Sequence, residues 1–321
     1  MTRCLVLCFL LTAIAGTSVR GSASAWPRAA ANPVIAGLAG EDADTPPAQA
    51  TPPTSPADAP ADQTKACAGV SFSRSLRYGE GEQNVLDVAT ADSTKTSPRP
   101  VLLFVAGESF TGDGAAPDTE ARDAAMCFAA RHGMVGVRMS WRPAPAYPWP
   151  AGAKDVAAAT SWVHENIDLF GGNADEIVLI GYSVGAFHVA SLLGHREFQE
   201  RDGDIAGAML VSGIYRGSAD ADATEKSYFG NDASKYDERS AFPGILNTET
   251  PLLLAWSRLD PPRLVAEGEK LKELLCHSPA HCPHTTVLRN REGLASAFGP
   301  DASLAGPTLE LIREIEARGL P

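Results

Sequence analysis

The sequence predicts an α/β protein, with a mostly parallel central sheet of about eight strands and helices on both faces. Short apolar runs alternate along the chain with longer stretches of helical periodicity, as repeated β-α units require. Several of these runs are continuous in Val, Ile and Leu, which is typical of strands buried on both faces of a parallel sheet. The part that carries this pattern, from Cys67 to Pro321, has a length usual for one large α/β domain.

Each predicted strand is a short run rich in aliphatic residues. Val101–Val105 and Ile177–Gly181 are uninterrupted apolar segments, and Leu252–Trp256 has a similar composition. In chain order the predicted strands are Asn84–Thr90, Val101–Val105, Met134–Met139, Ile177–Gly181, Ile205–Val211, Leu252–Trp256 and Thr286–Arg289.

The stretches between these strands carry helical signals. Ala153–Asn166 repeats small and aliphatic residues on one helical face, and Glu120–Arg131 is followed by Gly133, a common residue after a helix end. In chain order the predicted helices are Glu120–Arg131, Ala153–Asn166, Val184–Leu193, Pro262–Leu275 and Leu304–Arg318.

The N-terminal segment, residues 1–25, predicts a secretory signal peptide. Arg3 precedes an apolar stretch, Cys4–Gly16, and Ala23-Ser24-Ala25 supplies the small residues of a cleavage site. The alternative is a membrane anchor, but the apolar stretch is shorter than the roughly 20 residues that span a bilayer. We therefore expect a secreted or periplasmic protein whose mature chain has no membrane span.

Residues 26–66 are predicted to form a disordered linker ahead of a single domain at residues 67–321. Within the linker, Glu41–Asp62 is rich in Pro and Ala and has no aromatic residue, Lys or Arg. Such a segment cannot bury enough apolar surface to offset the entropy lost on ordering.

The composition argues against two classes of partner. The chain has 27 Lys and Arg against 39 Asp and Glu, and its formal net charge is -12. This sign opposes the binding of nucleic acid or an anionic membrane surface by bulk electrostatics. Neither is expected as a partner.

The strongest chemical signal is Gly181-Tyr182-Ser183-Val184-Gly185, a G-x-S-x-G motif. It directly follows the apolar run Ile177–Ile180 and opens a predicted helix, which is the context of a nucleophile elbow. In such a turn the Ser hydroxyl is exposed, and the flanking glycines let strand and helix approach closely. The alternative is a tight turn in which Ser183 caps the helix.

Two further stretches carry a family resemblance. Both resemble one branch of the α/β-hydrolase fold. Asn84–Val88 is similar to the first hairpin of that branch. Trp141–Pro145 and Pro148–Ala151 are similar to its Y-R-L-A-P and P-F-P-A segments. That branch holds secreted carboxylesterases and acetyl- or feruloyl-esterase-like proteins related to hormone-sensitive lipase and kynurenine formamidase. From about Ser71 onwards the chain resembles it. The resemblance implies a serine hydrolase of small carboxylic esters, with no cofactor and no metal.

The resemblance also implies the triad acid and a cap. Asp260 follows the predicted strand Leu252–Trp256, where this branch keeps the acid of its catalytic triad, and the order Ser before Asp fits the fold. The alternative is an acid that stabilises a helix N-terminus ahead of Pro261 and Pro262. Tyr215–Asn247 is expected to form a small cap that shapes the substrate pocket.

The oxyanion loop departs from this branch. The family reads H-G-G-[GSA]-[FW] after the strand Val101–Val105, whereas here the loop reads Ala106-Gly107-Glu108-Ser109-Phe110. The implied oxyanion donors are the backbone N–H groups of Gly107, Glu108 and Val184, which a side-chain change does not remove. The Glu108 carboxylate nonetheless opposes a developing negative charge unless it points away or is protonated.

The catalytic His is missing. The triad base of this branch lies in a stretch resembling G-H-[SND]-H-[MLF]-S, and the corresponding Asn290–Ala295 places Gly293 where the His belongs. Glu292 is the only nearby carboxyl that could act as a base, and it would be a weak one. We expect His132, His164 and His195 at the surface or at helix ends, His188 pointing back along its helix, and His277, His281 and His284 at the end of the sheet opposite Ser183.

The cysteines beyond the signal peptide suit an exported, oxidising setting. Cys276 and Cys282 are expected to close a small disulfide loop, since related esterases carry a similar pair here. The alternative is a metal site, because the histidines around this pair are also potential ligands. Cys67 is expected either to pair with Cys127 or to leave Cys127 as a buried free thiol.

Two hypotheses follow. The first is an exported serine esterase by descent, with Ser183 as nucleophile and Asp260 as acid, whose activity is weak or lost because the triad His is absent. The second is a catalytically inactive pseudo-hydrolase that serves as a ligand-binding or protein-binding module. They differ in whether an imidazole or another base lies within about 3 to 4 Å of the Ser183 hydroxyl.

Overall fold

The structure describes most of the domain that the sequence predicts after the linker. In the computed structural model the described residues are 67–91, 97–105, 107, 109–113, 119–199, 205–290, 297–298 and 303–319. The predicted signal peptide, residues 1–25, and the predicted linker, residues 26–66, lie outside them.

One eight-stranded sheet forms the centre of the domain, with strand order β1-β2-β4-β3-β5-β6-β7-β8. The pairs β1-β2 and β2-β4 are antiparallel, and all other neighbours in the sheet are parallel. The predicted α/β class with a mostly parallel sheet is confirmed. The strands are β1 (Val70–Arg77), β2 (Val85–Ala91), β3 (Arg99–Val105), β4 (Val135–Met139), β5 (Gly172–Tyr182), β6 (Gly207–Val211), β7 (Leu252–Ser257) and β8 (His284–Leu288).

The apolar runs of the sequence correspond to the central strands, whereas the edge strand β1 is not predicted. All residues of β3 are buried, so its run contains no polar interruption after Arg99. In β1 only Val70 is buried, and Ser and Arg residues separate its apolar side chains. A strand at the sheet edge therefore leaves a much weaker sequence signal than a strand covered on both faces.

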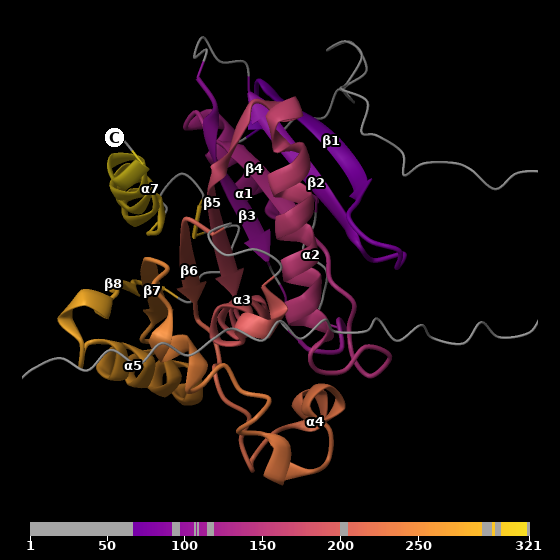
Figure 1. Ribbon diagram of the computed structural model, residues 1–321, viewed down its shortest axis with the longest axis vertical. Coiled ribbons are helices and arrows are strands. Elements are labelled where there is room, and N and C mark those ends of the chain that lie inside the picture. Colours follow the sequence, from indigo (N-terminus) through magenta and orange to yellow (C-terminus); the bar gives the residue numbers. More distant parts are fainter. Residues whose placement is uncertain are drawn as a thin grey trace, which may run out of the picture. The chain divides into compact units, whose positions relative to one another are not determined.

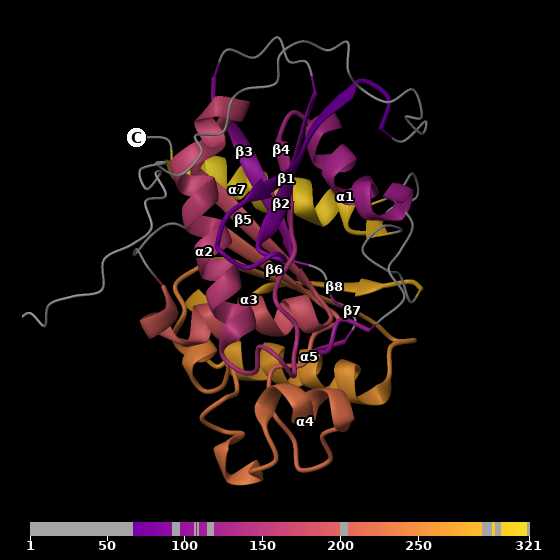
Figure 2. The ribbon, with the colours of Figure 1, turned by 90° about the vertical axis from the view of Figure 1, so that its right-hand side faces the viewer.

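Helices cover both faces of the sheet (Figure 1, Figure 2). Alternate residues of β3 point to opposite faces: Phe104 belongs to a core cluster with residues of α1 and α7, and Leu103 to one with residues of α2, α3 and α5. The helices are α1 (Thr119–Arg131), α2 (Ala151–Asn166), α3 (Val184–Gly194), α4 (Ala223–Phe229), α5 (Pro262–Leu275) and α7 (Ala305–Gly319).

The connections after β3 and after β5 lead in opposite directions along the strand order of the sheet. The chain passes from β3 through α1 to β4, and from β5 through α3 to β6, although β3 and β5 are neighbours. In open parallel sheets such a reversal leaves a crevice at the carboxyl ends of the strands, where ligands bind. Gly107 follows β3 and Ser183 follows β5, so both lie at the carboxyl ends of the strands. Helix α4 and its flanking loops lie beyond the carboxyl ends of β5 and β6 (Figure 1).

The described residues contain two disulfides. The predicted Cys276–Cys282 bridge is confirmed, so neither thiolate is free to bind a metal. Cys67 pairs with Cys127, which decides between the two alternatives for this pair and ties the start of the domain to α1.

Removing the two disulfides is expected to have unequal effects on stability. Chain-entropy arguments give about 4 kcal/mol for the Cys67–Cys127 bridge and about 2 kcal/mol for Cys276–Cys282, because the sequence separations are 60 and 6 residues. Denaturant unfolding of the two double Cys→Ala variants measures both values. Equal losses, or a larger loss for the short loop, would contradict this ranking.

Candidate functional site

Ser183 occupies a sharp turn between β5 and α3. Its backbone has φ 53° and ψ -118°, a conformation that costs free energy for any residue other than Gly. The Ser183 N–H donates to the carbonyl of Val211 at 2.9 Å, which holds the turn against β6. The side chain is half-buried and makes no helix-capping hydrogen bond, so the helix-cap alternative is not observed. A strained, partly exposed Ser after a buried strand is the geometry of a nucleophile elbow.

Gly181 permits the close approach of strand and helix in this turn. A Cβ on Gly181 would lie 2.5 Å from the Cα of Ala186 and 2.7 Å from the carbonyl oxygen of Gly185. Both neighbours are backbone atoms, so they cannot move aside as a side chain could. Ser183 therefore lies at the carboxyl end of β5, in a turn that requires Gly at position 181.

The expected oxyanion donor of the nucleophile turn is already bonded within the protein. The Val184 N–H donates to the carbonyl oxygen of Gly107 at 2.9 Å. A Cβ on Gly107 would lie 2.7 Å from the indole of Trp141, so the loop packs closely under that ring. Glu108 lies outside the described residues. In this conformation the Val184 N–H is not free to bind a developing oxyanion, which requires a donor pointing into the site.

Asp260 is held at the carboxyl end of β7 by two donors. Its Oδ2 accepts from the Ser212 hydroxyl at 2.7 Å and from the Ser257 N–H at 2.8 Å. The side chain makes no capping hydrogen bond to α5, whose N-cap is Pro261. Asp260 is 7% exposed. The carboxylate is thus fixed close to the sheet edge that carries Ser183.

Ser212 is a residue of this site that the sequence does not single out. It follows β6, has φ 48°, and is 3% exposed. Its hydroxyl donates to Asp260, the side chain that accepts from an imidazole N–H in a complete triad. A small polar residue directly after a buried strand is the only sequence signal that could have pointed to it.

No imidazole reaches either group. All seven histidines are in the described part of the chain, and none is hydrogen-bonded to Ser183 or Asp260 there. Strand β6 separates β5 from β7, so Ser183 and Asp260, which follow these two strands, are roughly 10 Å apart by strand spacing. His284 begins β8 at the end opposite Ser183, as predicted, and pairs with Glu314. His195 lies at the C-terminal end of α3, a helix end as predicted, and its Nε2 contacts the Ser240 carbonyl at 2.8 Å.

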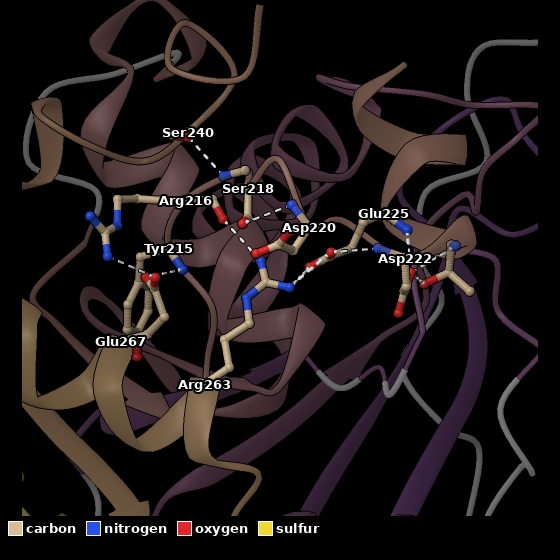
Figure 3. A network of polar contacts seen from close by, with 11 residues as sticks. Tyr215, Arg216, Ser218, Asp220, Asp222, Glu225, Ser240, Arg263 and Glu267 are labelled. Atoms are coloured by element: carbon tan, nitrogen blue, oxygen red, sulfur yellow. Dashed lines mark hydrogen bonds and ion pairs between the residues drawn. The ribbon is translucent and has the colours of Figure 1, made fainter. Parts of the chain in front are cut away.

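The segment between β6 and β7 is anchored to α5 by a polar network (Figure 3). Arg263 of α5 pairs with Glu225 of α4 at 2.8 Å, and Arg216 pairs with Glu267 of α5 at 3.0 Å. The two carboxylates are almost completely buried, whereas both guanidinium groups are partly exposed. Asp222 completes the network by capping α4. Helix α5, which begins two residues after Asp260, therefore holds the predicted cap in place.

Replacing Arg263 by Met is expected to destabilise the protein by about 2 kcal/mol, because it leaves the buried Glu225 carboxylate unpaired. The matched control is Lys270→Met, which breaks an exposed pair with Glu273 and should cost less than about 0.5 kcal/mol. Urea unfolding of both variants measures the difference. Equal effects would mean that the network does not anchor α4.

In the described ranges no three His, Cys, Asp or Glu side chains are grouped as metal ligands would be. Each helix found in those ranges is too short or too polar to span a bilayer.

Sequence comparisons point to esterases. The family model BD-FAE matches residues 86–236, a span that contains Ser183 and ends before Asp260. Esterase LipC of Mycobacterium tuberculosis is 33% identical over 121 residues, which are 38% of this chain and 29% of LipC. Esterase LipQ of the same organism is 29% identical over 212 residues, 61% of this chain and 48% of LipQ. The chain therefore spans less than half the length of either relative.

Solved structures agree on the fold. Esterase B of Lactobacillus rhamnosis has a TM-score of 0.65 at 14% identity, covering 78% of this chain and 89% of that protein. A bacterial heroin esterase has a TM-score of 0.61 at 20% identity, covering 81% of this chain and 87% of that protein. Together with the sheet order and the turn at Ser183, these similarities show that the chain has the α/β-hydrolase fold and that its sequence is similar to esterases over part of its length.

Proposed function

We propose that this protein is an exported serine esterase by descent that accommodates small carboxylic esters but hydrolyses them weakly or not at all. Ser183 is the nucleophile of the ancestral reaction and Asp260 its acid. The observation that carries the proposal is the lack of any imidazole on either group, with all seven histidines in the described residues. The curated relatives named esterases support the substrate class, and the two disulfides are compatible with export.

The chemical reason is that a Ser hydroxyl needs a base to attack an ester. In a complete triad the imidazole removes the hydroxyl proton during attack and returns it to the leaving alcohol. The Asp260 carboxylate cannot substitute, because strand β6 separates β7 from β5 and leaves it roughly 10 Å from Ser183 by strand spacing. Removing one triad member leaves about 10³- to 10⁴-fold catalysis over water, which comes from binding and the oxyanion hole.

A second candidate function is a pseudo-hydrolase that binds a ligand or a protein and has no catalytic role. The bond from the Val184 N–H to the Gly107 carbonyl favours it, because this bond removes the oxyanion donor that residual catalysis would need. The two candidates differ in whether any turnover depends on Ser183.

Hydrolysis of p-nitrophenyl acetate and butyrate by the purified chain, compared with a Ser183→Ala variant, tests the proposal. A wild-type rate within about 10-fold of the variant fits a weak or lost activity. A small Ser183-dependent rate favours the residual esterase, and equal rates favour the binding module. A loss of more than about 10³-fold in the variant would overturn both, because it requires a functioning base.

A further inference from the structure

His188 occupies a closed aromatic box beneath the candidate site. It lies on α3, the helix that Ser183 opens, and is completely buried. Phe110, Trp141, Phe187 and Tyr228 surround the ring, with centroid distances between 4.5 and 5.9 Å. The backbone of α2 closes the remaining side, since a Cβ on Gly152 would lie 2.3 Å from the imidazole Cε1.

The imidazole is poorly satisfied in this box. Its Nε2 has no hydrogen-bond partner among the described residues, and its Nδ1 is 3.5 Å from the Tyr228 hydroxyl. A Leu or Phe would fill such a space without leaving a buried polar atom unbonded. The position thus carries an ionisable group that packing alone does not require.

Few charges act near the box. Tyr228 of α4 is the titratable group that contacts the imidazole, and Asp155 of α2 lies near Tyr228. Asp155 is neutralised by a bidentate contact with Arg142 in the segment after β4. Among the described residues of the segment after β3, Phe110 contacts the imidazole. No carboxylate of the described residues contacts the ring, and burial lowers the pKa of His188 to about 3.

Two neighbours of His188 belong to the parts that build the site. Phe110 follows Gly107, whose carbonyl is bonded to the Val184 N–H, and Tyr228 lies on the cap helix α4. These two rings stack on each other at 4.6 Å. The imidazole therefore joins the oxyanion loop and the cap to the helix of the nucleophile.

We propose that neutral His188 is a positioning residue that holds Phe110 and Tyr228 against α3, and that its protonation releases both. An imidazolium carries two N–H donors and needs an acceptor for each, whereas the box offers one hydroxyl. Release of Phe110, three residues after Gly107, frees the Gly107 carbonyl from the Val184 N–H. Acid thus opens the oxyanion site, whether or not Ser183 hydrolyses esters.

Amide hydrogen exchange tests this proposal directly on the purified chain. Protection factors, which correct for the intrinsic effect of pH, are measured at about pH 7 and about pH 4.5. The pKa of His188 is about 3 in the closed state and takes the ordinary His value once the box is open. This difference predicts that protection of segments 109–113 and 184–187 falls on the order of 50-fold between the two pH values. The core strands β3 and β5 should keep their protection. His188→Leu and His188→Phe should abolish the change in the two segments.

Three results would overturn the proposal. The first is unchanged protection of the two segments in the wild type. The second is an equal loss in the core strands, because that reports global unfolding rather than local release. The third is the same acid-induced loss in a folded His188→Leu or His188→Phe variant. If neither variant folds, the wild-type protein still tests the proposal, because the acid-induced loss of protection in the two segments is compared with that in β3 and β5.

Discussion

Replacing Gly293 with His is expected to raise p-nitrophenyl ester hydrolysis by about 10²- to 10⁴-fold, the usual contribution of a positioned general base. Gly293 lies outside the described residues, and its choice rests on the resemblance to the family stretch that carries the triad His. The path of the chain supports the choice. Strand β8 ends at Leu288, which is paired with Ser257 at the sheet edge that leads to Asp260.

The gain must depend on Ser183, because an added surface imidazole hydrolyses activated esters by itself. The double variant Gly293→His with Ser183→Ala provides this control, and Gly293→Ala tests the loss of Gly alone. A gain that persists without Ser183 would show that the new imidazole acts independently of the elbow. No gain at all would show that a missing base is not what limits the reaction.

Replacing Asp260 with Asn in the Gly293→His background is expected to remove the gain, a loss of about 10²- to 10⁴-fold. The acid of a triad orients the imidazole and stabilises its charged form, and an amide does neither. In the wild-type background the same substitution should leave hydrolysis unchanged, because no imidazole is present to orient. Asn keeps an oxygen acceptor for Ser212 and Ser257, so the local structure can persist.

The matched control for this substitution is Asp220→Asn, which changes an exposed acid in the cap segment. Both wild-type-background variants are assayed beside their Gly293→His counterparts, so that the coupling between residues 260 and 293 is measured as a double-mutant cycle. A loss of more than about 10-fold from Asp260→Asn in the wild-type background would contradict the account, because Asp260 would then already support a base.

Much of the fold could be predicted because its signals are local. The predicted helix Pro262–Leu275 coincides with α5, whose start is marked by two Pro residues. The runs that form β3 and β7 are buried along their whole length, so hydrophobicity alone marks them. The edge strand β1 lacks such a run, and it is the strand that the sequence does not predict.

The contacts of the candidate site were less predictable because they depend on orientation. The sequence indicates that Gly107 and Val184 meet at the sheet edge, but it does not say which way a peptide plane faces. The observed carbonyl-to-amide bond follows from that orientation. Ser212 and Asp260 are 48 residues apart, so no local pattern announces their pairing.

His188 shows a different limit of periodicity. Helix α3 is buried from Val184 to Leu193, so its sequence has no polar stripe that would assign a face to each side chain. The prediction that His188 points back along its helix gives the direction of the side chain along the helix axis, but it does not identify the residues that contact the imidazole. Its neighbours come from α2, α4 and the segment after β3, which only the tertiary fold brings together.

The central claim, that the Ser183 hydroxyl is not activated, is tested most directly by a fluorophosphonate probe, which labels activated serine nucleophiles regardless of their ester specificity. Wild type, Ser183→Ala and Gly293→His are incubated with the probe, and the labelled residue is identified by mass spectrometry. The account predicts no labelling of Ser183 in the wild type and clear labelling in Gly293→His. Rapid labelling of Ser183 in the wild type would contradict it, because a base would then act on this hydroxyl.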